Sequence, residues 1–296
     1  MNNPPWLVVG QGAIGSLMAV RLAALDVPVQ IKLRAGRETT GELKIRSGAE
    51  RFRFATVENL TAPSWIFAAV KAYQVAPLIH ELRSSAAFQA STLIVSYNGM
   101  LADEASLLRD SDLHWITTHG AYREADAVIH AGHGQSWLGP QQAEHRAPAD
   151  MVEQLERALP PLSWINHIAP RRWQKLAVNC LINPFTVIHE CRNGDILRHI
   201  RADVWQQVAD EIAALATQRG VELSPQNLVQ QAEQVVKATA NNRSSMLQDY
   251  LQQRPTEIDY LNGFIASASA EAGLSAPANQ QLWQQVLDVT GGRDPR

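Results

Sequence analysis

The feature that most constrains the fold is a glycine-rich stretch near the start of the chain. The sequence GQGAIG places Gly10, Gly12 and Gly15 in the G-x-G-x-x-G spacing, after the apolar run Trp6–Val9 and at the start of a helical pattern. In that context the spacing is typical of a βαβ unit that binds a dinucleotide. The first glycine permits a tight turn, the second lets backbone approach a pyrophosphate, and the third lets the helix pack on the strand. The alternative is a glycine-rich turn without a ligand.

The end of the next strand indicates which dinucleotide is bound. An NAD site normally has an Asp or Glu about 20 residues further on, which binds the ribose 2′-hydroxyl. Here the strand reads VQIKLRAG and offers Lys32 and Arg34 but no acid. Cationic donors suit a 2′-phosphate, and an Arg can bind it with two hydrogen bonds. We therefore expect NADP(H), with Arg34 favoured over Lys32 because it stands at the strand end. The alternative is a solvated loop cation.

The pattern of apolar residues divides the chain into two domains. In the first part, strands alternate with helices, which predicts an α/β domain with a doubly wound, mostly parallel sheet of the Rossmann type over residues 1–167. The expected strands are Trp6–Val9, Val29–Leu33, Trp65–Val70, Thr92–Tyr97 and Trp115–His119, with a hairpin in Glu42–Val57 and short strands of an antiparallel extension at Val128–His130 and Ser136–Leu138. Residues 168–296 show no convincing strand and are expected to form an all-α domain. Its expected helices are Arg171–Asn183, Asp203–Gln218, Pro225–Thr239, Ser244–Gln252, Glu257–Ala272 and Asn279–Val289.

Composition excludes several classes of protein. The length of 296 residues suits two domains, and the net charge of −3 argues against a general nucleic-acid binder. No apolar run approaches the roughly 20 residues that cross a bilayer, and the N-terminus lacks the features of a signal peptide. We therefore expect a cytoplasmic monomer or homodimer that binds neither membranes nor nucleic acid. Cys180 and Cys191 are expected as free thiols. We interpret His130 and His133 as surface residues, and we expect no metal site.

A thin polar seam marks the first helix of the second domain. In WQKLAVNCLINP, Lys175, Asn179 and Asn183 stand at i, i+4 and i+8 among apolar neighbours. Because a helix turns by about 100° per residue, the three side chains fall within an arc of roughly 80°. Asn is a mediocre helix former, so two of them inside a helix need a reason. The seam indicates one wall of a cleft. The alternative is a Lys that reaches water beside two Asn that satisfy hydrogen bonds in the core.

Two further polar sites follow strands. Lys71 comes after Trp65–Val70, and Asn98-Gly99 comes after Thr92–Tyr97. Folds of this kind bind ligands beyond the carboxyl ends of their strands. Taken alone, each is better explained as a surface charge or a plain turn.

The motifs together resemble the ketopantoate reductase (2-dehydropantoate 2-reductase) family. The matching pieces occur in the family's order and cover both domains: GQGAIG, VKAYQV, YNGM, TTHGAYR, WQKLAVNCLINPFT, SSMLQD and TEIDYLNGF. A Lys-x-x-x-Asn helix is shared with related dehydrogenases, so SSMLQD followed by TEIDYLNGF carries the assignment. The resemblance implies reduction of 2-dehydropantoate to D-pantoate with NADPH, on the route to pantothenate and coenzyme A.

The resemblance also implies roles for individual residues. Lys175 and Glu257 match the catalytic positions. The cofactor-binding positions match Gly10, Gln11, Gly12, Ala13, Ile14, Gly15, Arg34, Lys71, Asn98 and Ala121. The substrate-binding positions match Asn179, Asn183, Asn193, Asn242 and Ser245. One departure is Arg192, a long cation next to Asn193, which predicts a differently shaped loop.

The chemistry gives these residue types a purpose. Reduction of a 2-keto acid builds negative charge on the carbonyl oxygen, which must be stabilised and finally protonated. A protonated Lys175 can do both. Glu257 can accept a hydrogen bond from the substrate or product hydroxyl; without the family match it would be interpreted as an exposed acid in a first helical turn.

Two other functions stay open. One is another NADP-dependent 2-keto or 3-hydroxy acid dehydrogenase with the same two-domain plan, since the pocket and not the fold sets the substrate. The other is a non-catalytic protein that senses NADP(H), which would need the glycine loop but neither Lys175 nor Glu257.

Overall fold

The computed structural model describes residues 3–33, 41–141 and 145–291, with the side chain of Ala202 left aside. The chain forms two compact units. Unit 1 comprises Met1–Tyr97 and Ala105–Ile168, and unit 2 comprises Asn98–Glu104 and Ala169–Arg296. A single boundary after residue 167 misses one feature of this division. The short segment Asn98–Glu104 belongs to the second unit although both of its neighbours in sequence belong to the first.

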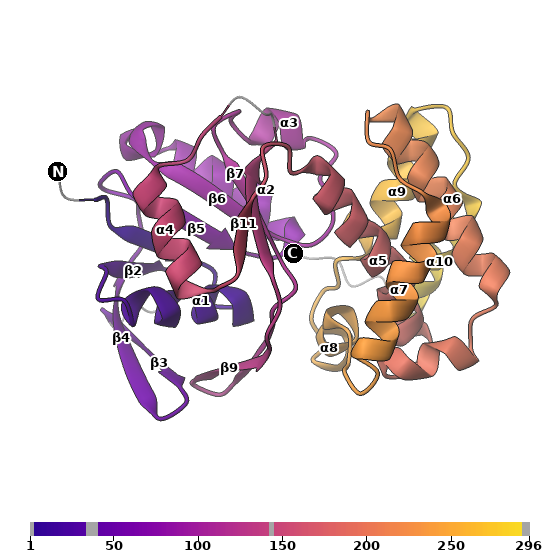
Figure 1. The fold of residues 1–296 in the computed structure, drawn as a ribbon, viewed down its shortest axis with the longest axis horizontal. Coiled ribbons are helices and arrows are strands. Elements are labelled where there is room, and N and C mark those ends of the chain that lie inside the picture. The colour runs from indigo at the N-terminus through magenta and orange to yellow at the C-terminus, as the bar shows by residue number, and fades with distance from the viewer. Residues whose placement is uncertain (1–2, 34–40, 142–144, 292–296) are drawn as a thin grey trace. The chain divides into compact units, whose positions relative to one another are not determined.

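Unit 1 is built on one mixed sheet, shown from indigo to magenta in Figure 1. Its strands within the described residues are β1 Trp6–Val9, β2 Val29–Lys32, β3 Glu42–Ser47, β4 Glu50–Val57, β5 Trp65–Ala69, β6 Thr92–Ser96, β7 Leu113–Thr117, β8 Gly120–Glu124, β9 Ala127–Gly132, β10 Ser136–Pro140 and β11 Leu162–Trp164. They lie in the order β11-β10-β7-β6-β5-β1-β2-β4-β3-β9-β8. The helices are α1 Ala13–Ala23, α2 Ala72–Arg83, α3 Glu104–Leu107 (whose first residue belongs to unit 2) and α4 Ala149–Ala158, with a 3-10 turn η1 at Ala86–Ala90.

The central strands run parallel, as the alternation of strands and helices predicts. β1 pairs in parallel with β2 and β5, and β5 and β6 continue the parallel order to β7. These strands are continuous apolar runs because both of their faces are covered, and Val8, Ile66 and Phe67 are fully buried. The carboxyl ends of β1 and β5 therefore lie side by side, next to Gly10 and Lys71.

The antiparallel pairs lie toward the edges of the sheet, as the expected hairpin and antiparallel extension predict. β10 pairs with β7 and β8 pairs with β9 antiparallel, so the sheet is mixed. The strand expected at Trp115–His119 begins two residues earlier, at Leu113. β8, β11 and helix α4 were not expected from the sequence. β8 and β9 pack against α1, which lends them tertiary support that no local pattern displays.

Unit 2 is helical, and its C-terminal part is drawn from crimson to yellow in Figure 1. Its elements are α5 Ala169–Ile188, η2 Asn193–Arg198, α6 Ala202–Gln218, α7 Pro225–Ala238, α8 Ser245–Leu251, η3 Ile258–Tyr260, α9 Asn262–Glu271 and α10 Pro277–Thr290. Helix α5 packs against α6, α7, α8 and α10, so it forms the centre of the unit. A Rossmann-type sheet domain followed by an all-α domain is thereby confirmed.

Helix α5 runs through a proline without breaking. Pro184 lacks the N–H that would bond the carbonyl four residues earlier, which belongs to Cys180. The amide Nδ2 of Asn262, in α9, donates to that Cys180 carbonyl oxygen at 3.4 Å. Asn262 itself is fully buried. A side chain from TEIDYLNGF therefore completes the hydrogen bonding of the helix that carries Lys175.

The helix expected over Glu257–Ala272 is interrupted. The 3-10 turn η3 ends at Tyr260, and α9 begins only at Asn262, after Leu261 with φ −108° and ψ −103°. Glu257 precedes both elements and is only 4% exposed. The interpretation of Glu257 as an exposed acid of a first helical turn is therefore wrong. In the parts of the chain that the structure describes, no helix is long and apolar enough to cross a membrane.

Candidate active site

The glycine loop joins β1 to α1, and its geometry requires two of the three glycines. Gly10 has a φ of +100°, and a Cβ there would lie 2.0 Å from the carbonyl oxygen of Ala69 at the end of β5. A Cβ on Gly15 would lie 2.1 Å from the Gly10 carbonyl oxygen. Any side chain at either position would push the helix away from the strand. The roles predicted for the first and third glycines are thus visible as close backbone contacts.

The middle glycine faces open space. Gly12 is exposed, and a Cβ on it would meet no atom within 4 Å. It is the N-cap of α1, where the first amides of the helix have no partner inside the helix. Gln11, Ala13 and Ile14 complete the loop and are half-buried. An open concave turn at a helix N-terminus fits an anionic pyrophosphate, because both the amides and the helix dipole favour negative charge.

Arg123 supports this loop, and sequence reasoning missed it. Its guanidinium Nη1 donates to the Gln11 carbonyl oxygen at 3.2 Å and to the Ser16 hydroxyl at 3.0 Å. Arg123 lies on β8, as does Ala121, which is half-buried and pairs with His130 across the hairpin. The only sequence signal was TTHGAYR itself, which resembles the family loosely. Arg123 brings a positive charge to the loop that would meet the pyrophosphate.

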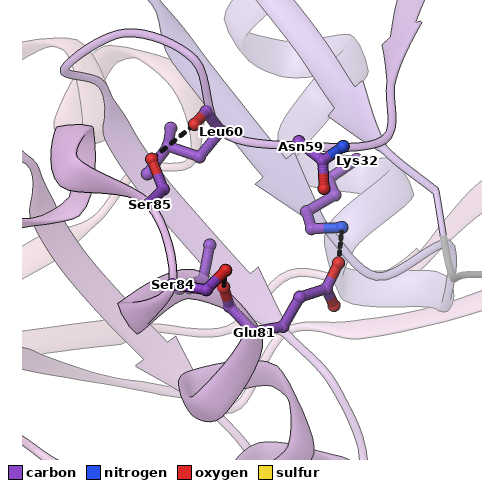
Figure 2. A pocket seen from close by; sticks show the side chains of 7 residues that line it. Lys32, Asn59, Leu60, Glu81, Ser84 and Ser85 are labelled. Atoms are coloured by element: carbon purple, nitrogen blue, oxygen red, sulfur yellow. Dashed lines mark hydrogen bonds and ion pairs between the residues drawn. The ribbon is translucent and has the colours of Figure 1, made fainter.

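The Lys32 ammonium is bound to three oxygens within unit 1. Lys32 is only 3% exposed, and its ammonium donates to Glu81 Oε1 at 2.5 Å, to the carbonyl oxygen of Glu58, and to the Leu33 carbonyl oxygen at 3.5 Å. Figure 2 shows the ion pair of Lys32 with Glu81. The two residues border a pocket of about 250 Å³ that is also lined by Asn59, Leu60, Leu82, Ser84 and Ser85. Three oxygens match the three ammonium hydrogens, so this lysine has a structural role. Arg34 lies outside the described residues and stays a prediction.

The polar seam of α5 is a narrow stripe beside buried apolar residues. Lys175 and Asn179 are half-buried, Asn183 is 6% exposed, and the flanking Leu176, Ala177 and Cys180 are buried. Burial lowers the pKa of the Lys175 ammonium, while the negative charge of Glu257 raises it to a smaller extent. The net result is a lysine that gives up its proton more readily than one in water. A general acid works best when its pKa approaches the working pH.

Glu257 has a second neighbour from a distant part of the chain. Asn98 Nδ2 donates to Glu257 Oε2 at 3.2 Å. The backbone of Gly99 packs on that of Tyr260, because a Cβ on Gly99 would lie 2.2 Å from the Tyr260 carbonyl oxygen. Gly99 also has a φ of +82°, which favours glycine. The explanation of Asn98-Gly99 as a plain turn is therefore insufficient. Asn98, predicted to bind cofactor, lies with the catalytic candidates in unit 2.

The remaining predicted substrate contacts lie around the ends of α7 and α8. The Asn193 backbone N–H donates to the Asn242 carbonyl oxygen at 3.0 Å, and Asn193 Nδ2 donates to Thr239 Oγ1 at 2.8 Å. Asn193 is buried, whereas Asn242 and Ser245 are exposed. The neighbouring Arg192 is bound to the same region, since its Nη1 donates to the Asn241 carbonyl oxygen at 3.0 Å.

Ser245 begins α8 immediately after a residue that is bonded to α5. Ser244 is the N-cap of α8, where its Oγ accepts from the Leu247 N–H at 3.0 Å. The same oxygen lies 2.6 Å from Thr186 Oγ1, and Thr186 Oγ1 donates to the Asn183 carbonyl oxygen at 2.7 Å. The start of α8 is therefore fixed to the same helix that carries the polar seam.

One interpretation of the histidines is wrong. His130 lies on β9 and is half-buried, and its Nε2 is 3.0 Å from Nδ1 of the buried His119. The Gly134 N–H also donates to His119 Nδ1, so that nitrogen is an acceptor and His130 must supply the shared hydrogen. Burial, and to a smaller extent the charges of His130, His133 and Arg21, lower the pKa of His119 to about 4. Only His133 lies on the surface as expected.

Comparison with known proteins decides the family. Residues 6–143 match the family model "Ketopantoate reductase PanE/ApbA", and residues 167–289 match "Ketopantoate reductase PanE/ApbA C terminal". The chain is 32% identical to 2-dehydropantoate 2-reductase of Yersinia pestis over 94% of its own length and 93% of that protein's. It is 33% identical to the same enzyme of Vibrio cholerae serotype O1 over 95% of its length and 96% of that protein's. The chain belongs to the ketopantoate reductase family.

Solved structures agree on the fold of this family member. A ternary structure of D-mandelate dehydrogenase with NADH and anilino(oxo)acetate aligns with a TM-score of 0.85 and 18% identity, covering 97% of this chain and 99% of that one. A dimeric ketopantoate reductase from Staphylococcus aureus aligns with a TM-score of 0.77 and 19% identity, covering 98% and 100%. At such identities the likeness concerns the fold alone. The predicted family is confirmed, and the chain is an oxidoreductase of that family.

Proposed function

We propose that this chain reduces 2-dehydropantoate to D-pantoate with NADPH, with Lys175 as the general acid. The observation that carries the proposal is the polar seam of α5 in unit 2, where burial lowers the pKa of Lys175 and the charge of Glu257, which accepts a hydrogen bond from Asn98, opposes that effect. Bound NADPH would supply the hydride that reaches the substrate carbonyl carbon. The relatives named 2-dehydropantoate 2-reductase support the substrate.

Each side chain has a definable task in this reaction. The Lys175 ammonium donates a hydrogen bond to the carbonyl oxygen, stabilises the charge that develops there, and delivers a proton to it. Glu257 accepts a hydrogen bond from the new hydroxyl group, and Asn98 orients that carboxylate through its bond to Oε2. Asn179 and Asn183 offer neutral donors and acceptors along the same helix face. Asn193, Asn242 and Ser245 are proposed to bind the rest of the substrate, with Ser245 donating to its carboxylate.

Unit 1 carries the glycine loop and other residues proposed to bind the cofactor. The loop Gly10–Gly15 would hold the pyrophosphate, with Arg123 fixing Gln11 and Ser16. Arg34 is proposed to bind the 2′-phosphate, because Lys32 is committed to Glu81. Lys71 and Ala121 are proposed as further contacts. We further propose a place for the enzyme in pantothenate and coenzyme A biosynthesis in the cytoplasm, as a monomer or homodimer.

The experiment is steady-state oxidation of NADPH with 2-dehydropantoate and a panel of other 2-keto acids. Highest kcat/KM for 2-dehydropantoate would support the proposal. A clear preference for another acid would favour a related 2-keto acid dehydrogenase, since the fold is shared with D-mandelate dehydrogenase. Binding of NADPH without turnover of any acid would favour a sensor.

A further inference from the structure

The Asn98–Glu104 segment leaves the sheet unit and packs into the helical unit over only seven residues, after which the chain returns to unit 1. Its first half is bound to the residues that follow Glu257. The Met100 N–H donates to the Tyr260 carbonyl oxygen at 2.9 Å, and Gly99 lies against the same carbonyl group. These contacts place Asn98 so that its amide reaches Glu257 Oε2.

The last residue of the segment is fixed by an ion pair to α5. Arg172 Nη2 donates to Glu104 Oε2 at 2.6 Å, and Arg172 Nη1 donates to Glu104 Oε1. The side chains are only 8% and 14% exposed. Arg172 lies one helical turn before Lys175 on α5. The segment is therefore bound at one end beside Glu257 and at the other to the helix of Lys175.

A bidentate ion pair of this kind fixes the position of one side chain relative to the other. The planar guanidinium and carboxylate fix both distance and orientation, which a lysine cannot do. Removing two charges from water is costly, so a buried ion pair stabilises a fold little compared with apolar residues of the same volume. Its geometric precision is the property that an apolar replacement would lack.

We propose that Arg172 and Glu104 form a positioning pair, which holds the Asn98–Glu104 segment against α5 and thereby sets where the Asn98 amide meets Glu257 beside Lys175. The proposal rests on the proposed function for its activity readout. Neither residue is assigned contact with substrate. Their effect on catalysis passes through Asn98.

The test removes both charges together, in Arg172→Met with Glu104→Gln, so that no buried charge is left alone. We expect kcat/KM for 2-dehydropantoate to fall about tenfold or more, since misplacement by an ångström can cost up to about a hundredfold. The same pair of substitutions in an Asn98→Ala background should change kcat/KM by less than twofold, because the group being positioned is already gone. With Asn98 in place, Arg172→Lys should lower kcat/KM less than the double variant does. In the Asn98→Ala background, Arg172→Lys should cause no further loss of kcat/KM.

A second readout does not depend on activity. Amide hydrogen exchange over residues 98–104 should become faster in the double variant, because the Met100 N–H bond to Tyr260 is released more often. Amide exchange in α5 should stay unchanged.

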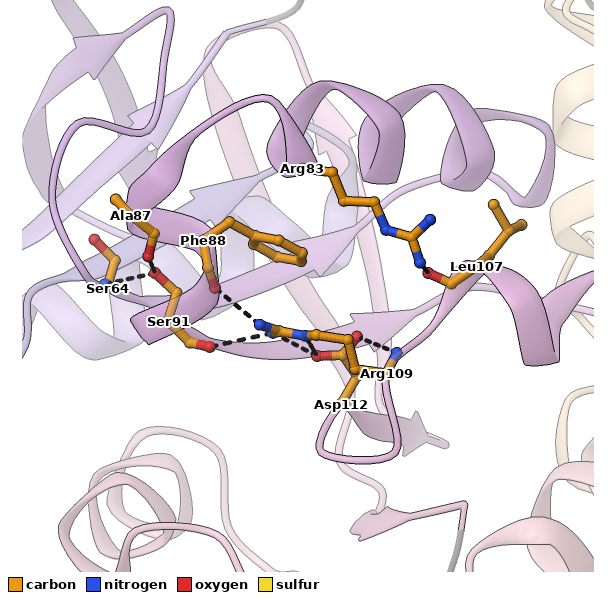
Figure 3. Close-up of polar contacts among 8 residues, drawn as sticks. All are labelled: Ser64, Arg83, Ala87, Phe88, Ser91, Leu107, Arg109 and Asp112. Carbon is orange, nitrogen blue, oxygen red and sulfur yellow. Dashed lines mark hydrogen bonds and ion pairs between the residues drawn. The ribbon is translucent and has the colours of Figure 1, made fainter.

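A matched control is available in unit 1. Arg109 and Asp112 form a similar buried pair, with Arg109 Nη2 donating to Asp112 Oδ1 at 2.6 Å and side chains 20% and 1% exposed (Figure 3). Arg109→Met with Asp112→Asn should lower the melting temperature while kcat/KM per folded molecule stays within twofold of wild type.

Three results would overturn the positioning role. They are a kcat/KM within twofold of wild type in the double variant, an equal loss in the Asn98 and Asn98→Ala backgrounds, and unchanged exchange over residues 98–104. If the double variant does not fold, Arg172→Lys in the two backgrounds decides between the same outcomes. Failure of the wild type to reduce 2-dehydropantoate would instead refute the proposed function; the exchange experiment would still decide the inference.

Discussion

At the scale of single residues, the surroundings of Lys175 set its chemistry. The residue is one of three polar groups on a helix face whose neighbours are buried. Burial lowers the pKa of its ammonium and Glu257 raises it in part. These two influences can be separated, because the glutamate can be neutralised without changing the burial.

Glu257→Gln should therefore lower the pKa of Lys175 further. If Lys175 must be protonated to act, activity is lost as pH rises through that pKa, so the alkaline limb of the kcat/KM profile should move to lower pH. The rate itself should also fall, because Glu257 is proposed to contact the substrate. Glu271→Gln, which changes an exposed acid of α9, should leave the limb in place. An unmoved limb in Glu257→Gln would contradict the coupling.

The two cations near the end of β2 should behave differently. Arg34→Ala should raise the KM for NADPH much more than that for NADH, because only NADPH carries the 2′-phosphate. Lys32→Met removes a buried ion pair with Glu81 and should lower the melting temperature while affecting both cofactors alike. An equal rise in KM for NADPH and NADH in Arg34→Ala would contradict the assignment of Arg34 to the 2′-phosphate.

At the scale of elements, a hydrogen bond joins two family motifs of unit 2, WQKLAVNCLINPFT and TEIDYLNGF. Pro184 leaves the Cys180 carbonyl oxygen without its helical partner, and Asn262 donates to it from α9. The same Asn262 amide also donates to Asn279 Oδ1 at 3.0 Å, which ties α9 to α10. The proline of one motif therefore explains the buried asparagine of the other.

A double-mutant cycle tests this relation. Asn262→Ala should destabilise the protein by about 1–3 kcal/mol, because it leaves buried groups unsatisfied. Pro184→Ala restores an N–H that can bond the Cys180 carbonyl oxygen within α5. The combined variant should therefore be more stable than the sum of the single effects by about 0.5 kcal/mol or more, measured by urea unfolding. Strictly additive effects would show that the proline and the asparagine act independently.

Elements also show how far the sequence could predict the structure. The glycine loop, the parallel strands and the polar seam of α5 follow local patterns, so their positions were predicted closely. β8 and α4 depend on packing against α1, and the early end of η3 depends on the hydrogen bond that the Tyr260 carbonyl oxygen accepts from the Met100 N–H. The ion pair of Lys32 with Glu81, the support by Arg123 and the proximity of Asn98 to Glu257 join residues far apart in sequence. No spacing within the chain could have revealed them.

At the scale of the whole molecule, each unit has its own core, and a buried histidine makes the stability of unit 1 depend on pH. In unit 1 the buried His119 has its pKa lowered to about 4, from about 6.5 in an unfolded chain. Between these values the unfolded state binds more protons than the folded state, so stability falls as pH decreases through this window.

His119→Gln should therefore reduce the acid sensitivity of the fold. Its melting temperature should decline less than that of wild type between pH 7 and about pH 4.5. His80→Gln on α2, where the histidine is exposed, serves as the control and should follow the wild-type curve. Parallel curves for wild type and His119→Gln would show that acid stability is governed by other groups.

The most direct test of the proposed mechanism is kcat of Lys175→Ala with 2-dehydropantoate and NADPH, measured with the folded fraction of the same preparation. Removing the general acid should lower kcat by about 10²–10⁴-fold, while NADPH affinity hardly changes. Lys175→Arg should not restore the rate, because a guanidinium keeps its proton at any working pH. An alanine variant that turns over at a near wild-type rate per folded molecule would contradict the assignment of Lys175 as the general acid.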